Sequence, residues 1–285
     1  MKRQVPLAIM ILSTLLLSVA CNQEKKTVKT LQGYNLEKPE RFPMPESLLE
    51  ISGICFNKGI NDTIYAIQDE EGKLFRLAPG NKKQVHAKFG RSGDYEDVAI
   101  VRDKVIVLKS NGSLFSFPFS DAIYEEVDSV QEYAKLLPEG EYEGMFGDEL
   151  SGQLYILCKN CKVDNNDNVT GYIYKADEDL LTPSGQFNID VESIKPFSGK
   201  VKKGLRPSAL AKNPLTGEWF IVSAVNKLLV IADGDWRIKE AYPLDGNVFN
   251  QPEGIAFDAA GNMYISNEGD NITTGNILKF PRQRS

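Results

Sequence analysis

The chain has 285 residues, of which 39 are acidic and 33 are basic, and a net charge of −6. It contains no long run of lysine or arginine, which argues against nucleic acid as a partner, because phosphate contacts need clustered basic side chains. His86 is the single histidine, which excludes a histidine-rich metal centre.

The N-terminal segment is predicted to be a targeting signal. Lys2 and Arg3 precede an apolar stretch, residues 5–20, that is shorter than the ~20 residues needed to span a bilayer. Cys21 follows directly, and the junction resembles a bacterial lipobox, in which the cysteine becomes the lipidated N-terminus. Leu17 lies four rather than three residues before this cysteine. An uncleaved anchor helix and an ordinary secretory signal are the alternatives, and both also place the domain outside the cytoplasm.

Three parts are therefore expected along the chain. Residues 1–20 are a lipoprotein signal peptide, residues 21–33 a lipidated polar tether, and residues 34–285 the folded domain. Without the signal the net charge becomes −8, because residues 1–20 contain two basic residues and no acidic one. Asn22, rather than an aspartate, follows Cys21, which resembles the sorting signals of outer-membrane lipoproteins. We expect a cell-envelope location with a membrane lipid anchor, at the outer rather than the inner membrane.

Short apolar segments that recur along the domain predict an all-β fold. Five segment starts align: EISGICF at 50, YEDVAIV at 95, YEGMFGD at 142, RPSALAK at 206 and QPEGIAF at 251. Their aligned positions, separated by 44, 47, 65 and 45 residues, are Ser52, Glu96, Glu143, Ser208 and Glu253. Each copy continues through a turn to a second and a third apolar segment, and most copies end in a less regular fourth.

Four strands in ~45 residues make the blade of a β-propeller, so we predict a propeller of five four-stranded blades. A sixth, degenerate blade in the 65-residue interval is an alternative, as are an open sandwich and two small β domains. The polar stretch NCKVDNNDNVTG in that interval is interpreted as a loop insertion. The fifth copy has three strands only, and residues 29–36 are predicted to add the fourth and close the ring, which removes two exposed sheet edges.

The aligned positions are predicted to gather around one mouth of a central channel. The first strand of a blade lines the channel and the second runs antiparallel beside it, so the start of one and the end of the other share a face. Besides the five aligned residues, this mouth is expected to include Asp69, Asp97, Lys109, Lys159, Asn267 and Glu268. His86 falls in a predicted outer strand, which leaves a Ser-His-Asp or Cys-His mechanism without a base.

Crowded carboxylates raise one another's pKa, and a bound cation reduces that cost. Calcium prefers carboxylate and other oxygen ligands, so it is the candidate cofactor, with Glu96, Glu143 and Glu253 as candidate ligands. Two structural alternatives stay open. Lys109 and Lys159 could neutralise the glutamates in a salt-bridge ring, or the glutamates could accept hydrogen bonds from backbone N–H groups of neighbouring blades.

The cysteines suggest little chemistry. Cys158 and Cys161 form a CxxC pair, which is typical of a local disulfide or of a redox motif. No βαβ context is predicted around them, which favours the disulfide, and two cysteines without a nearby histidine make a poor zinc site. Cys55 lies in an apolar run and is expected to be a buried free thiol.

The starts ISGICF, YEDVAIV and YEGMF and the last segment QPEGIAFDAAGNMYISNE resemble the SdiA-regulated protein family, related to the YjiK proteins of bacterial envelopes. The resemblance extends from about residue 45 to 282. It implies an NHL-type or phytase-like propeller and supports a cation near the three glutamates, but it implies no reaction.

Whether the protein is an enzyme stays open on this evidence. The sequence predicts a lipoprotein that binds a small ligand or an envelope partner at an acidic mouth. A metal-assisted hydrolase of the lactonase or phosphoesterase type and a purely structural interaction scaffold are the alternatives.

Overall fold

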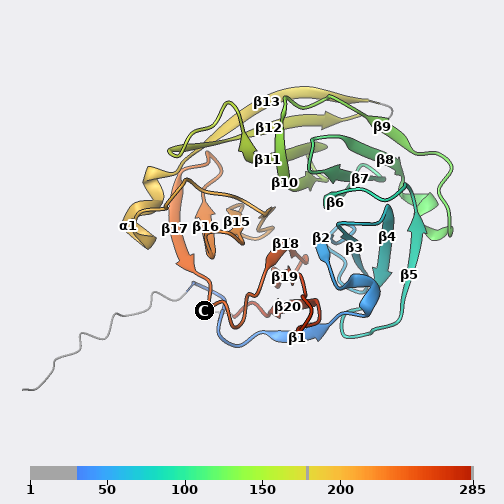
Figure 1. The fold of residues 1–285 in the computed structure, drawn as a ribbon, viewed down its shortest axis with the longest axis horizontal. Helices are drawn as coiled ribbons and strands as arrows, with labels where there is room; N and C mark the ends of the chain where they lie inside the picture. The colour runs from blue at the N-terminus through green and yellow to red at the C-terminus, as the bar shows by residue number, and fades with distance from the viewer. Residues whose placement is uncertain (1–30, 178–179, 284–285) are drawn as a thin grey trace, which may run out of the picture.

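A computed structural model describes residues 31–177 and 180–283. Within them, twenty strands form five four-stranded antiparallel sheets that follow one another around a ring (Figure 1). The prediction of a five-bladed β-propeller is confirmed. The 65-residue interval holds no sixth blade; it is long because the last three strands of the third blade have nine or ten residues each.

Each blade contributes one strand to each of four concentric layers. The innermost strands are β2 (Ile51–Cys55), β6 (Tyr95–Val101), β10 (Gly140–Asp148), β14 (Ala209–Lys212) and β18 (Pro252–Phe257). The second strands are β3 (Ile64–Gln68), β7 (Lys104–Lys109), β11 (Gln153–Cys161), β15 (Trp219–Ser223) and β19 (Met263–Asn267). The third strands are β4 (Lys73–Leu77), β8 (Leu114–Pro118), β12 (Asn168–Ala176), β16 (Leu228–Ala232) and β20 (Asn276–Phe280). The outer strands are β5 (Gln84–Lys88), β9 (Gln131–Tyr133), β13 (Leu181–Asp190), β17 (Ile238–Pro243) and β1 (Glu40–Pro43).

Helical structure is confined to short connections in the described residues. The helices are η1 (Glu46–Leu48), η2 (Phe119–Ile123), η3 (Glu192–Ile194) and α1 (Lys195–Ser198). Across residues 31–177 and 180–283, no helix is both long enough and apolar enough to cross a membrane. The predicted signal peptide and Cys21 lie outside the described residues.

The hydrophobic core is divided among the contacts between blades. Five buried apolar clusters are present, and each joins two neighbouring blades of the ring. Alternation along a strand explains this arrangement, because successive side chains point to opposite faces of a blade and so enter two different clusters. Every blade thus buries both faces, and the ring holds together without a separate central core.

The ring is closed by an N-terminal strand, as predicted, but not by the predicted segment. β1 pairs antiparallel with β20, from Glu40 opposite Lys279 to Pro43 opposite Asn276. The proline is tolerated because β1 is an edge strand. In the expected segment 29–36, the described residues form a turn with Gly33 at a φ of 86°. Tyr34 is buried in this segment, so its apolar residues were mistaken for a strand.

The polar insertion is only partly a loop. The turn ends at Asp167, and the rest of the stretch belongs to β12. Asp164 holds the hairpin together, because its Oδ1 accepts hydrogen bonds from the backbone N–H and the hydroxyl of Thr170, at 2.9 and 2.6 Å.

Candidate functional site

A repeated backbone irregularity positions the aligned residues. In β18, Pro252 pairs with Asn267 and Gly254 with Ser266, so Glu253 is an extra residue without a partner on β19. The same bulge leaves Glu96 unpaired in β6 and Glu143 unpaired in β10, and a similar shift includes Ser52 in β2. Bulges re-aim side chains and are common beside functional sites.

The bulged residues lie around one acidic cavity of about 420 Å³. Its lining includes seven residues predicted for the mouth: Ser52, Asp69, Glu96, Glu143, Lys159, Glu253 and Glu268. Four further lining residues were not predicted: Asp94, Ser110, Glu141 and Gln251. The cavity therefore combines seven carboxyl groups with a single lysine.

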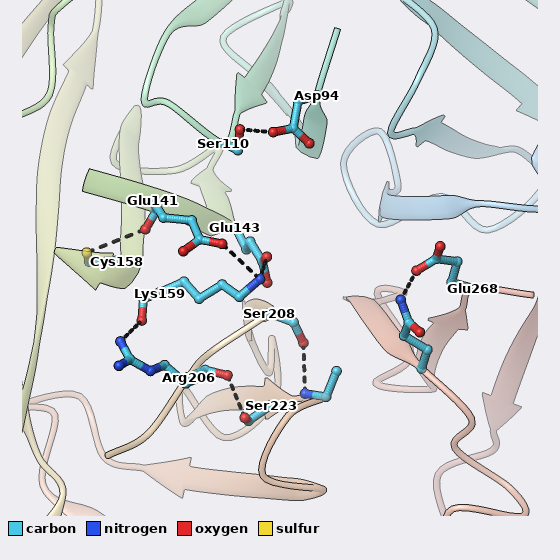
Figure 2. Close-up of polar contacts among 12 residues, drawn as sticks. Asp94, Ser110, Glu141, Glu143, Cys158, Lys159, Arg206, Ser208, Ser223 and Glu268 are labelled. Carbon is cyan, nitrogen blue, oxygen red and sulfur yellow. Dashed lines mark hydrogen bonds and ion pairs between the residues drawn. The ribbon is translucent and has the colours of Figure 1, made fainter. Parts of the chain in front are cut away.

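The repeat contained a signal for most of the missed residues. Asp94, Glu141 and Gln251 each lie two positions before an aligned glutamate, so they form a second column in the same alignment. Ser110 was recognisable as the end of the second strand in its blade. Its hydroxyl donates a hydrogen bond to the carboxylate of Asp94 (Figure 2).

Lys159 is the only basic side chain in the lining, and it is committed to one side of the cavity. Its ammonium group forms an ion pair with Glu143 and lies 3.2 Å from Oε1 of Glu141 (Figure 2). Both partners belong to β10, the strand next to β11, which carries the lysine. The third blade thus neutralises part of its own charge.

The remaining carboxyl groups have no such neutralisation. Among the described residues, no lysine or arginine lies within ion-pair distance of Asp69, Glu96, Glu253 or Glu268. Glu268 instead accepts a hydrogen bond from the side-chain amide of Gln251. These four groups come from blades 1, 2 and 5, so their charge faces the side of the cavity away from Lys159.

Burial and like charge raise the pKa of the two bulged glutamates. Burial raises the pKa of Glu96 to about 8, Asp94 and Glu253 add to the rise, and Lys159 opposes it. Burial likewise raises the pKa of Glu253 to about 7, even though Lys159 favours its charged form. Around neutral pH, both groups therefore hold protons that a bound cation would displace.

The two residues at the ends of second strands behave similarly. Burial raises the pKa of Glu268 to about 7, with further contributions from Glu253 and Asp69. Burial also raises the pKa of Asp69 to about 6, with Glu50 adding to the rise. In addition, Oδ1 of Asp69 is buried without any hydrogen-bond partner. A buried, unpartnered carboxylate oxygen is costly and is an indication of a missing ligand.

Asp97, predicted for the mouth, lies instead in the wall between blades. It is 4 % exposed and does not line the cavity. Its two oxygens accept backbone N–H bonds from Val98, at 2.8 Å, and from Met145 of the next blade, at 2.7 Å. Burial raises the pKa of Asp97, and these two donors oppose the rise. The inter-blade hydrogen bond considered for the glutamates is thus made by their neighbour.

Asp97 fits into the wall because the opposing residue is small. A Cβ atom on Gly53 of the preceding blade would lie 2.5 Å from the Cα of Asp97. A Cβ atom on Gly254 would lie 2.6 Å from the carbonyl oxygen of Ser52. The position after each aligned residue faces a neighbouring blade at close range, which explains why three of the five blades have glycine there.

Three other predicted mouth residues lie outside the lining. Ser208 is buried, and its hydroxyl donates to the carbonyl of Pro252 at 2.7 Å, so it links blades 4 and 5. The ammonium group of Lys109 lies 5.3 Å from the ring centroid of Tyr95, so it completes no salt-bridge ring. Asn267 is fully buried and its side-chain amide donates to Asn276. Strand ends alternate in direction, and the sequence did not determine which of them faced inward.

The donor chemistry of the cavity suits calcium, but the spacing does not form a closed cage. Calcium takes six to eight oxygens at about 2.3–2.6 Å. No three carboxyl groups of the cavity bring oxygens within 4.8 Å of one another; among the residues the structure describes, only Cys158, Cys161 and Asp164 form such a group. A disulfide joins these two cysteines, so they offer no thiolate ligands. A hydrated ion or a larger organic cation fits the cavity better than a bare ion.

Comparison of the sequence with protein-family models and with curated proteins gives no match. Three solved structures share the fold. Glutaminyl cyclase of Myxococcus xanthus has a TM-score of 0.55 and 14 % identity over 86 % of this chain and 96 % of that chain. The luciferin-regenerating enzyme has a TM-score of 0.52 and 11 % identity over 86 % and 95 %. Regucalcin of Agrobacterium tumefaciens, a calcium-binding protein, has a TM-score of 0.51 and 13 % identity over 88 % and 95 %.

At these identities the likeness shows the architecture and not the activity. The resemblance to the SdiA-regulated family stays a prediction that these comparisons do not test. What they and the sheet order establish together is that the chain is a five-bladed β-propeller.

Proposed function

We propose that this protein is a lipid-anchored protein of the cell envelope whose propeller binds a positively charged ligand in the acidic cavity. Calcium is the first candidate for that ligand. The anchor is the predicted lipidated Cys21, and the binding face is the end of the channel at which the innermost strands begin.

The charge balance of the cavity is the observation that carries the proposal. Asp69, Glu96, Glu253 and Glu268 share one cavity without a basic partner, and the pKa of each is raised. Mutual repulsion of this kind costs folding free energy, and a cation among the four groups would turn the cost into attraction. Binding rather than catalysis is favoured, because the cavity contains no histidine, cysteine or tyrosine beside the carboxyl groups.

Two kinds of cation are compatible with the geometry. A calcium ion would keep several waters and bind two or three carboxylates, since the oxygens are too widely spaced to enclose it alone. A polyamine would place separate ammonium groups near separate carboxylates across the same volume. The likeness to regucalcin is a likeness of fold, so the choice between the two depends on experiment.

Thermal melting at pH 8 tests the proposal. A ligand at 100 times its Kd stabilises the folded state by about 2.7 kcal/mol, which corresponds to roughly 5–10 °C for a domain of this size. We expect calcium chloride to raise the Tm, sodium chloride of equal ionic strength not to, and a chelator to reverse the rise. A rise with spermidine alone would replace calcium by an organic cation, and no rise with either would refute cation binding.

The anchor has a separate test. Metabolic labelling with an alkyne analogue of palmitate is expected to mark the full-length chain and not the Cys21→Ser variant. Equal labelling of both chains, or a soluble wild-type protein in the periplasmic fraction, would contradict the lipoprotein assignment.

A further inference from the structure

The opposite end of the channel holds a second cavity of different chemistry. It measures about 640 Å³ and is lined by the far ends of the innermost strands and the turns that follow them. Every blade contributes an aliphatic residue two positions after its aligned residue: Ile54, Val98, Met145, Leu210 and Ile255. Phe56, Phe146 and Phe257 add aromatic surface. The cavity is thus an apolar funnel enclosed by all five blades.

The charged residues around this funnel are already paired with one another. Lys58 lies 3.0 Å from Asp103 and 3.7 Å from Glu149. Lys212 lies 3.8 Å from a carboxylate oxygen of Asp148. The fifth charged residue in the lining, Asp258, accepts hydrogen bonds from the side-chain amides of Asn61 and Asn262, at 2.8 and 2.7 Å. An ionised ligand would find no free counter-charge here.

We propose that this funnel is a second ligand-binding site, which takes an uncharged apolar small molecule. Its volume lies within the roughly 300–1,000 Å³ typical of small-molecule sites, which are likewise mostly apolar with a few polar groups. Enclosure by five blades favours a small molecule over an extended macromolecular surface. The site shares no lining residue with the acidic cavity, so this inference is independent of cation binding.

Two sources of such a molecule follow from the position of the funnel. The side-chain amide of Asn213, which lines it, donates to the hydroxyl of Tyr34 at 2.9 Å. The chain therefore enters the domain beside the funnel, on the side from which the proposed tether leaves, where acyl chains of a membrane lie within reach. A compact aromatic molecule from solution has the same apolar chemistry but a different shape.

Fluorescence titration of the full-length protein with N-phenyl-1-naphthylamine, an uncharged apolar dye, tests the proposal. The ring centroid of Trp219 lies 5.4 Å from that of Phe146 in the wall, so a bound dye should accept energy from tryptophan. We expect saturable dye emission with one site per chain and a matching loss of tryptophan emission. Displacement by dodecan-1-ol would identify a linear chain and displacement by naphthalene a ring; displacement by neither would overturn the proposal.

Three variants locate the site. Phe146→Asn places a polar amide in the wall and should weaken dye binding about tenfold or more. Leu150 and Ile272 are both almost fully exposed, at 94 % and 93 %, but only Leu150 lines the funnel. Leu150→Asp should weaken binding severalfold and its matched control Ile272→Asp should not, and this pair decides the test if Phe146→Asn does not fold. Unchanged dye binding in folded Leu150→Asp would refute the assignment.

Discussion

The two mouths of the channel are built from the same five strands and have opposite chemistry. At one mouth the strands begin with bulged residues, and seven carboxyl groups surround about 420 Å³. At the other mouth the same strands end in aliphatic and aromatic side chains around about 640 Å³. The apolar ends could be required by packing alone, whereas nothing in packing requires repelling carboxylates. The acidic mouth is therefore the stronger indicator of function.

Glu96 and Asp97 repeat this contrast between two consecutive residues. The bulge leaves Glu96 in the cavity without a positive partner, whereas Asp97 enters the wall and accepts two backbone N–H groups. One carboxylate destabilises the empty fold and the other supports it. Variants that separate these two roles test the comparison, and they are taken from the largest expected effect to the smallest.

Asp97→Ala is expected to be the most damaging change. It leaves two buried N–H groups without acceptors, at about 1–3 kcal/mol each, and should lower the Tm by on the order of 10 °C. Glu96→Gln, one residue away, should not lower the Tm at pH 8. Thermal melting of both variants checks this, and a similar loss in both would remove the distinction between wall and cavity.

The pH dependence of stability should identify the cavity groups. Their pKa values in the folded state are raised to about 6–8, above those of an unfolded chain, so the folded state holds more protons. Stability from these groups is full at low pH and is lost as the pH rises through that range. Between pH 5 and about pH 9 the wild type should therefore lose several degrees of Tm more than the Glu96→Gln/Glu253→Gln/Glu268→Gln variant. Parallel curves would contradict the raised pKa values.

Replacing the two predicted lysines separates a cavity residue from one outside it. Lys159→Met removes the only positive charge in the lining, so the empty protein should lose a few degrees of Tm at pH 8. The same change frees Glu143 and Glu141 and should tighten calcium binding severalfold, as titration calorimetry would measure. Lys109→Met is the matched control and should leave calcium binding unchanged. Weaker calcium binding in Lys159→Met would sink this account of the charge balance.

The two aligned serines should give the smallest difference. Ser208→Ala removes a buried hydrogen bond to the next blade, worth about 1 kcal/mol, or roughly 2–4 °C of Tm. Ser52→Ala removes a hydroxyl that lines the cavity and makes only a 3.5 Å contact with the carbonyl of Glu50. Its Tm should change by less than half as much. The reverse order in a melting experiment would exchange the roles assigned to the two residues.

The repeat made the fold and most of the acidic cavity predictable. The spacing of Ser52, Glu96, Glu143, Ser208 and Glu253 was sufficient to count blades and to place the innermost strands. It could not find the closing strand, because β1 has only four residues and lacks the alternation of a half-buried strand. The apolar residues that seemed to form it anchor a turn instead.

Side-chain direction was the part that the sequence left undetermined. A bulge adds one residue to a strand and reverses the expected alternation after it, so Asp97 was assigned to the mouth and is in the wall. The same uncertainty affected Lys109, Ser208 and Asn267. Bulges have no strong sequence signal here, and only the strand register revealed them.

Titration calorimetry with calcium at pH 8 tests the central claim most directly. Wild-type protein should give saturable heat with one site per chain. The Glu96→Gln/Glu253→Gln/Glu268→Gln variant, shown to be folded by its Tm, should give none. Equal heats from both proteins would place any calcium outside the acidic cavity, and no heat from the wild type with calcium or with spermidine would contradict a cation-binding mouth.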